Sequence, residues 1–149
     1  MKKVILVDVD GTLANTEHRE HFLTVRPKMW KEYKRQAPYD KPYEDIVWLV
    51  KLLRQAGNII LIVTARSEDE RTQTKEWLDK VAGLKGMYDK IYMRGVDDYR
   101  DHSIVKKDLL EEIRQDGYDP YMVLDDHNEV VEMWREQKLR CLQVQIGDF

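Results

Sequence analysis

The sequence has a single cysteine, Cys141, and no long hydrophobic run. One thiol cannot form a disulfide within the chain, which indicates a reducing, cytoplasmic compartment. No apolar stretch approaches the ~18 residues that a membrane-spanning helix needs, and the N-terminus has no hydrophobic signal-peptide core. We therefore expect a soluble intracellular protein with no membrane contact, in which Cys141 is a buried structural thiol.

The sequence also lacks an excess of positive charge. Lys and Arg number 25 and Asp and Glu 28, a net charge of −3, so the overall basic footprint of a strong nonspecific nucleic-acid binder is absent. A small basic cleft for a phosphate remains compatible with this balance. No His/Cys cluster has zinc spacing, and no Gly-x-x-x-x-Gly-Lys loop is present, so we expect no P-loop kinase within these residues.

The most informative stretch that is present runs from Val4 to Thr12. Four consecutive apolar residues lead directly into Asp8-Val9-Asp10-Gly11-Thr12, and such a short continuous run is typical of a strand buried on both faces. Asp8 and Asp10 lie two apart in extended chain, so their side chains point to the same side. They are either turn and cap residues or two carboxylates that share a chemical role.

Apolar runs and helical patterns alternate along the 149 residues, which predicts one α/β domain over residues 1–149. We expect a Rossmann-like, mainly parallel central sheet with helices on both faces. The expected strands cover residues 4–7, 59–63, 90–94, 121–124 and 139–144. The expected helices begin at Pro42, Glu68, Ser103 and Glu129. Core packing is expected of Trp48, Trp77 and Trp134.

A long polar passage, residues 15–41, interrupts the alternation of strands and helices after the first strand. Parts of it have helical patterns, so we expect a small, cap-like helical insertion over the carboxyl edge of the sheet. It carries several charged residues, including His18 and Arg19. Those charges either form a solvated surface or line the mouth of a substrate site.

Polar residues end three of the expected strands: Asp8 and Asp10, Thr64 and Arg66, and Asp125 and Asp126. In open α/β sheets, ligands bind outside the carboxyl ends of the strands, so these residues are expected to converge. Lys106 falls in the first turn of a helix, where a cation opposes the helix dipole unless an anion lies nearby. Thr64 and Ala65 precede a helix start, where backbone N–H groups favour an anion.

Carboxylates and a lysine in this arrangement favour phosphoryl transfer assisted by Mg²⁺, which prefers hard oxygen ligands. Asp8 could attack phosphorus to form an aspartyl-phosphate, and Asp10 could act as general acid and base, worth roughly 10² to 10⁴ in rate. Lys106 would balance the charge of the nucleophile and the phosphate. Asp125 would complete the metal site, with Asp126 beside it or bound to a metal water.

The order Asp8-Val9-Asp10-Gly11-Thr12, Thr64, Lys106 and Asp125-Asp126 resembles the four motifs of the haloacid dehalogenase (HAD) superfamily. It argues against a two-component receiver domain, in which the acidic pair precedes the phosphorylated Asp. The second half is similar to the 3′-phosphatase domain of phage-type polynucleotide kinase–phosphatases. Residues 130–135, residues 143–149, Arg94 and the loop from Arg100 to Lys106 carry that similarity.

The resemblance implies specific roles. Asp8 would be the nucleophile, Asp10 the acid/base, and Mg²⁺ would be held by Asp8, the Asp10 carbonyl and Asp125, with Asp126 adjacent. The expected phosphate and substrate contacts are Thr64, Ala65, Arg66, Lys106, Arg94, Arg100, His18 and Arg19. His18-Arg19 is a pair that also occurs in related phage-like phosphatase domains.

The resemblance further implies a Mg²⁺-dependent phosphomonoesterase that removes 3′-phosphates from nucleic-acid ends or nucleotides. With no kinase half expected here, such a phosphatase would act alone or beside a separate kinase or ligase, and a phage origin would suit it. One alternative is a small-molecule phosphatase such as a 5′(3′)-nucleotidase. Another is a non-catalytic module that binds phosphorylated ends, although a pure binder has no use for the Asp8/Asp10 pair.

Overall fold

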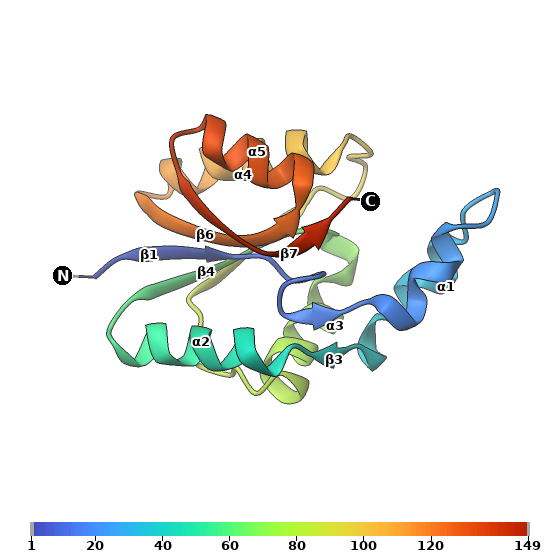
Figure 1. The fold of residues 1–149 in the computed structure, drawn as a ribbon, viewed down its shortest axis with the longest axis horizontal. Coiled ribbons are helices and arrows are strands. Elements are labelled where there is room, and N and C mark those ends of the chain that lie inside the picture. Colours follow the sequence, from blue (N-terminus) through green and yellow to red (C-terminus); the bar gives the residue numbers. More distant parts are fainter. Residues whose placement is uncertain (1, 149) are drawn as a thin grey trace.

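The computed structural model describes residues 2–148 and contains a five-stranded, all-parallel sheet between two layers of helices (Figure 1). Phe149, the last residue of the segment that carries the phosphatase similarity, lies outside the described residues. In spatial order the strands are β5 (Lys90–Arg94), β4 (Ile59–Ser67), β1 (Val4–Val7), β6 (Pro120–His127) and β7 (Arg140–Gly147). The predicted α/β class and parallel sheet are confirmed.

The central strand β1 is buried on both faces, as its continuous apolar run predicts. Leu6 packs into a core beneath α4 (His102–Gln115) and α5 (Asn128–Glu136). Ile5 and Val7 point to the other face, into a core beneath α2 (Glu44–Gln55) and the segment formed by α3 (Arg71–Glu76) and the π-turn η4 (Trp77–Val81). Figure 1 shows these two layers above and below the sheet.

Three local predictions were wrong. Pro42 does not begin a helix: it lies in the short strand β3 (Lys41–Pro42), which pairs antiparallel with β2 (Ala14–Asn15), and α2 starts at Glu44. The helix expected from Glu68 is divided into a 3₁₀ turn η3 (Glu68–Glu70), α3 and η4. Trp48 is 63% exposed, because the apolar face of α2 is wide enough to leave it at the margin.

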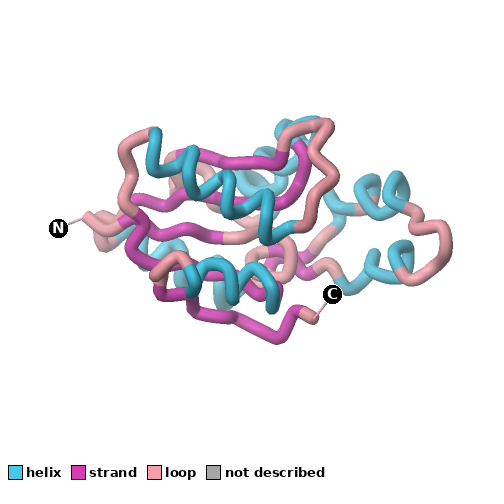
Figure 2. The backbone as a smooth tube through the Cα atoms, turned by 90° about the horizontal axis from the view of Figure 1, so that it is seen from above, coloured by secondary structure: helices cyan, strands magenta, loops and turns pink. Residues whose placement is uncertain are grey.

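The predicted helical insertion is present and forms an arm that projects from the body of the molecule (Figure 1, Figure 2). It consists of the 3₁₀ helix η1 (Glu17–Leu23), α1 (Trp30–Arg35) and the 3₁₀ turn η2 (Ala37–Tyr39). The β2–β3 pair closes its base, and Tyr43 N donates to Leu13 O at 2.7 Å. Its role as a cap stays a prediction.

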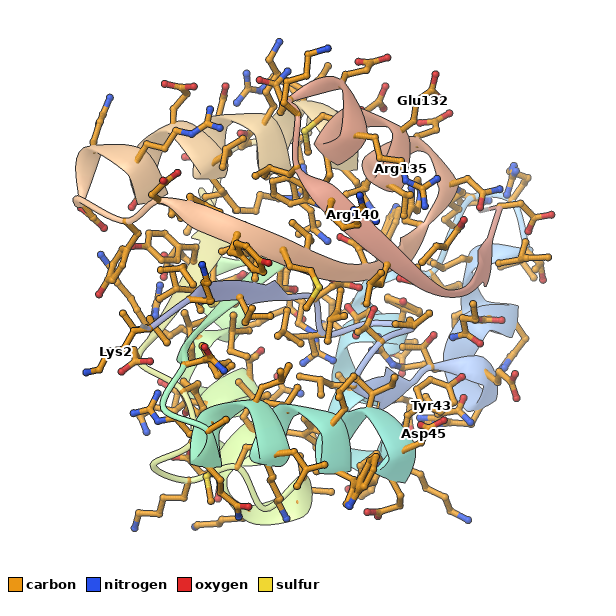
Figure 3. All side chains as sticks on the ribbon, turned by 60° about the vertical axis from the view of Figure 1, so that its left-hand side comes forward. Lys2, Tyr43, Asp45, Glu132, Arg135 and Arg140 are labelled. Carbon is orange, nitrogen blue, oxygen red and sulfur yellow. The ribbon has the colours of Figure 1, made fainter. Side chains whose placement is uncertain are left out.

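The arm leaves the sheet at the carboxyl end of β1. Figure 3 shows Lys2, which precedes β1, at one end of the sheet, and Tyr43 and Asp45, at the start of α2, at the other. Both connections of the arm are therefore on the side where the predicted functional residues end their strands. Within residues 2–148, none of the helices has the length and apolar character that crossing a bilayer requires.

Candidate active site

The predicted carboxylates meet at the carboxyl ends of two adjacent strands, β1 and β6, next to the end of β4, which carries Thr64 and Arg66. Asp8 directly follows β1, and its backbone N–H donates to Leu124 O of β6 at 3.0 Å. Asp125 and Asp126 lie at the carboxyl end of β6, which extends to His127 rather than ending at Leu124. Convergence at this edge follows from the parallel sheet, because all its carboxyl ends share one side.

Lys106 joins two of these carboxylates. Its Nζ donates to Asp8 Oδ1 and to Asp125 Oδ2, each at 2.8 Å, and the side chain is buried. Thr12 Oγ1 donates to Asp8 Oδ2 at 3.0 Å, and Trp134 Nε1 donates to Asp125 Oδ2 at 3.1 Å. The anion expected beside this helix-start lysine is therefore present, and both carboxylates are held in fixed orientations.

Three buried carboxylates form a cluster that fits a hard divalent cation. Asp8, Asp125 and Asp126 each offer an oxygen, and these oxygens lie within 4.8 Å of one another. Asp126 Oδ1 is buried and accepts no hydrogen bond. A buried acceptor without a donor is costly, and a bound Mg²⁺ with its waters would satisfy it.

Gly11 leaves room for the Asp126 carboxylate. Its φ of +84° lies in the left-handed region, and an added Cβ would lie 2.0 Å from Asp126 Oδ2. A side chain at this position would displace the carboxylate. The glycine of the Asp-x-Asp-Gly-Thr motif is therefore needed both for the turn out of β1 and for the approach of β6.

The electrostatics of the cluster also favour a cation. Burial, together with the neighbouring charge of Asp125, raises the pKa of Asp8 well above its ordinary value despite Lys106. Burial raises the pKa of Asp126 to about 6. Burial alone would lower the pKa of Lys106, but Asp125 and Asp8 raise it above its ordinary value. A single lysine thus leaves negative charge uncompensated among three carboxylates.

The side chain of Asp10 faces away from this cluster and toward two arginines. Arg66 Nη2 donates to Asp10 Oδ1 at 2.6 Å and Arg66 Nε to Asp10 Oδ2 at 3.1 Å, while Arg19 Nη2 donates to Oδ1 at 2.9 Å. Burial would raise the pKa of Asp10, but Arg66 and Arg19 hold it below the ordinary value. Asp10 is therefore ionised at neutral pH in this arrangement.

Asp40 is a site residue that sequence reasoning missed. Its carboxylate is fully buried and accepts from Arg19 Nε and Nη2, each at 2.8 Å, from Arg66 Nη2 at 3.3 Å, and contacts His18 Nε2 at 2.6 Å. Trp77 Nε1 donates to the Asp40 backbone carbonyl at 2.9 Å. No motif marks this residue in the sequence; only its place at the returning end of the insertion hints at it.

The structure brings His18, Arg19 and Arg66 to one network around Asp10 and Asp40. Thr64 is buried at the end of β4, and its Oγ1 accepts from the backbone N–H of Arg66 at 3.1 Å. The contacts of these side chains with a phosphate stay predictions. In the structure, Arg19 and Arg66 pair with Asp10 and Asp40, and His18 contacts Asp40.

Arg94 and Arg100 lie in a neighbouring loop. Arg94 Nε donates to Ala65 O at 2.8 Å, and its Nη1 donates to Arg100 O at 2.6 Å, so Arg94 supports the Thr64–Arg66 turn from behind. The Arg100 guanidinium pairs with Asp98 and Asp108 at the surface. Neither guanidinium contacts Asp8, Asp10 or Asp125 in the described residues, and a direct phosphate contact from either stays a prediction.

Comparisons with known proteins found similar sequences and similar folds. The family model of the polynucleotide kinase PNKP phosphatase domain matches residues 2–149. A chain of the Pnkp1/Rnl/Hen1 complex is 32% identical and superimposes with a TM-score of 0.82 over 100% of this chain and 48% of that one. CbbY of Rhodobacter sphaeroides, solved in complex with phosphate, is 18% identical with a TM-score of 0.68, over 100% of this chain and 88% of its own, and shows the shared fold.

Among curated proteins, a predicted bifunctional polynucleotide kinase/RNA ligase of Autographa californica nuclear polyhedrosis virus is 26% identical over 138 residues, 92% of this chain. The chain spans only 18% of that virus protein and less than half of the Pnkp1/Rnl/Hen1 chain. The four motifs, the acidic cluster and the match along nearly the whole chain together lead to one assignment: this chain belongs to the HAD-type family of polynucleotide kinase PNKP phosphatase domains.

Proposed function

We propose that this chain is a Mg²⁺-dependent phosphomonoesterase that removes 3′-phosphates from nucleic-acid ends through an aspartyl-phosphate on Asp8. The observation that supports it best is the buried Asp8 carboxylate, held by Lys106 and Thr12 beside Asp125 and Asp126. The matches named above are the PNKP phosphatase-domain family, a chain of the Pnkp1/Rnl/Hen1 RNA repair complex and a polynucleotide kinase/RNA ligase. From the nucleic-acid substrates in these names we propose that this chain also acts on nucleic acid.

In the first step, an Asp8 carboxylate oxygen attacks phosphorus, a P–O bond to Asp8 forms and the bond to the 3′-oxygen breaks. Asp10 gives its proton to the leaving 3′-oxygen. In the second step, Asp10 takes a proton from water, which attacks the phosphorus and releases Asp8 and inorganic phosphate. Bound Mg²⁺, held by Asp8, Asp125 and Asp126, would neutralise charge on the phosphoryl oxygens.

The arginine contacts of Asp10 give a reason for its change of role. While Arg66 and Arg19 hold Asp10 ionised, it suits the base role of the second step. A substrate phosphate carries negative charge that competes for the same guanidinium groups. Weaker pairing with arginine raises the pKa of a carboxyl group, which allows Asp10 to carry the proton that the first step requires.

The test is a substrate panel with one enzyme preparation. We expect rapid release of phosphate from 3′-phosphorylated oligonucleotides, slower release from 3′-mononucleotides and little from 5′-phosphorylated ends or sugar phosphates. Equal rates on sugar phosphates would instead indicate a small-molecule phosphatase. Tight binding of 3′-phosphorylated ends without hydrolysis would indicate a binding module.

For partners, we propose that the chain works beside polynucleotide kinase or RNA ligase modules. Removal of a 3′-phosphate leaves a 3′-hydroxyl, which is the end that a ligase joins to a 5′-phosphate. Co-purification of this chain with such an activity from its source would support the proposal, and a consistent absence of association would contradict it.

A further inference from the structure

The outer part of the insertion, residues 26–35, differs in charge from the rest of the chain. It holds five Lys and Arg residues and one Glu, whereas the whole chain has a net charge of −3. Within residues 2–148, Arg26, Lys28 and Lys31 form no ion pair with a carboxylate. Lys34 and Arg35 pair with Glu70 and Glu32, so the positive charge available to an anionic ligand is that of the other three residues.

The same segment carries large side chains that the fold does not cover. Trp30 is 48% exposed and Met29 44% exposed, and α1 has no buried residue at all. A six-residue helix with no buried side chain gains little stability from packing. Exposed aromatic rings interleaved with cations are typical of surfaces that bind single-stranded nucleic acid, through base stacking and phosphate contacts.

Alternating cations and rings connect this tip to the catalytic edge of the sheet. The Arg19 guanidinium, which donates to Asp10 Oδ1 at 2.9 Å, lies 4.1 Å from the centre of the Tyr33 ring. Tyr33 and Trp30 meet edge to face with ring centres 6.0 Å apart, and Lys28 Nζ lies 5.5 Å from the Trp30 ring centre. The arm projects from the molecule beyond the carboxyl end of β1 (Figure 1), and Asp10 lies three residues past that end.

We infer that residues 26–35 bind the single strand that leads to the 3′-phosphate, with Trp30 stacking on a base and Lys28 and Lys31 contacting backbone phosphates. This inference rests on the proposed function, because it requires a nucleic-acid substrate. A mononucleotide has no neighbouring base or phosphodiester to offer such a surface. The arm thus favours oligonucleotides over nucleotides at a site whose chemistry would accept both.

The experiment compares Trp30→Ala with wild type on a 3′-phosphorylated decanucleotide and on a 3′-mononucleotide. Loss of one stacking ring should raise KM for the decanucleotide about tenfold and leave kcat and both mononucleotide constants unchanged. Trp30→Phe keeps a stacking face and should restore most of the affinity. The matched control is Trp48→Ala on α2, which is 63% exposed and lies outside the arm; it should change nothing.

The lysines are tested by salt dependence. Lys28→Ala with Lys31→Ala should lower the slope of log KM against log salt by about 1.4 for the decanucleotide, since each lost single-strand phosphate contact accounts for about 0.7. An unchanged slope overturns the phosphate contacts. An unchanged decanucleotide KM in Trp30→Ala, or an equal loss on the mononucleotide, overturns the stacking role.

Failure of this inference can be separated from failure of the proposed function. Hydrolysis of 3′-phosphates with no dependence on oligonucleotide length or on Trp30 overturns the binding surface and leaves the phosphatase. Binding of a fluorescent decanucleotide that weakens in Trp30→Ala, without any hydrolysis by the wild type, supports the surface and removes the phosphatase.

Discussion

The carboxylate of Asp8, which we propose as the nucleophile, is buried among Lys106, Thr12, Asp125 and Asp126. Asp8→Asn keeps the size of the side chain but removes the carboxylate that we propose as the nucleophile. We expect phosphatase activity to fall by about 10³ or more, while binding of inorganic phosphate is retained. Steady-state kinetics with a 3′-phosphorylated oligonucleotide, together with calorimetric phosphate binding, measures both.

The control for Asp8→Asn is Asp119→Asn, an exposed Asp next to the opposite end of β6. It should leave activity unchanged. Hydrolysis that persists in Asp8→Asn at a rate near that of the wild type would remove Asp8 from the nucleophile's role.

Asp40 is the shared counter-ion of Arg19 and Arg66, and its side chain is fully buried. Asp40→Asn leaves two buried guanidinium groups with less negative charge, so we expect the free energy of unfolding to fall by about 3 kcal/mol or more. Activity should fall as well, because both arginines orient Asp10. Urea denaturation followed by circular dichroism measures the free energy of unfolding.

The comparison for Asp40 is Asp108→Asn, which removes a partner of Arg100 from an exposed pair whose side chains are 50% and 58% accessible. Exposed pairs contribute less than about 1 kcal/mol, so this variant should unfold almost as the wild type does. Equal stability losses in the two variants would contradict the structural role of Asp40.

At the scale of elements, the site depends on how closely the turn after β1 approaches the end of β6. Gly11→Ala would place a Cβ 2.0 Å from Asp126 Oδ2 and 2.5 Å from its Cγ. We expect Mg²⁺ affinity and activity to fall at least tenfold, because the carboxylate must move from the cluster. Isothermal titration with Mg²⁺ tests this.

Gly117→Ala separates backbone strain from crowding. Gly117 also has a positive φ, +96°, but nothing lies within 4 Å of an added Cβ. This variant should lose about 1 kcal/mol of stability and keep its Mg²⁺ affinity. If Gly11→Ala binds Mg²⁺ as tightly as Gly117→Ala does, Asp126 is not a ligand.

Two other elements position the remaining groups. Lys106 is the fifth residue of α4, just past the first turn, and it reaches the carboxyl ends of β1 and β6, where its Nζ donates to two carboxylates. The β2–β3 pair brings the two ends of the arm together, so Arg19 and Asp40 meet at its base. The arm is thus tied to the site by charge rather than by a hydrophobic core of its own.

For the whole molecule, stability should depend on Mg²⁺ and pH together. Burial raises the pKa of Asp8 and raises that of Asp126 to about 6, above the unfolded value of 3.8. The metal-free fold therefore binds these protons more tightly than the unfolded chain, and loses their stabilisation as pH rises toward and above 6. A divalent cation needs the deprotonated carboxylates, so its affinity rises over the same interval.

We therefore expect Mg²⁺ to raise Tm more at pH 7.5 than at pH 5, with EDTA reversing the effect. Differential scanning calorimetry at both pH values measures it. Asp126→Asn should reduce the difference between the two pH values. A Mg²⁺-induced shift that is the same at pH 5 and pH 7.5 would mean that the cation binds elsewhere.

Much of the fold, and the part of the site made of Asp8, Asp125, Asp126 and Lys106, could be predicted from patterns in short stretches of the sequence. The buried strand β1, the carboxylates that end it, the Asp125-Asp126 pair and the misplaced helix-start lysine are all visible in short stretches of sequence. Parallel strands present their carboxyl ends together, so those residues had to converge. Trp48 was misjudged because a helical pattern shows which residues share a face but not where that face ends.

The network around Asp10 was decided by the tertiary structure alone. Asp40 lies 21 residues from Arg19 and 26 from Arg66, and the contact among the three forms only when the arm folds back beside the turn after β1. Single buried ion pairs leave no periodic signal, since one Asp in a polar segment looks like any solvated residue. The sequence by itself thus determined which carboxylates end adjacent strands and converge, whereas packing across the end of the sheet decided which charged groups hold them in place.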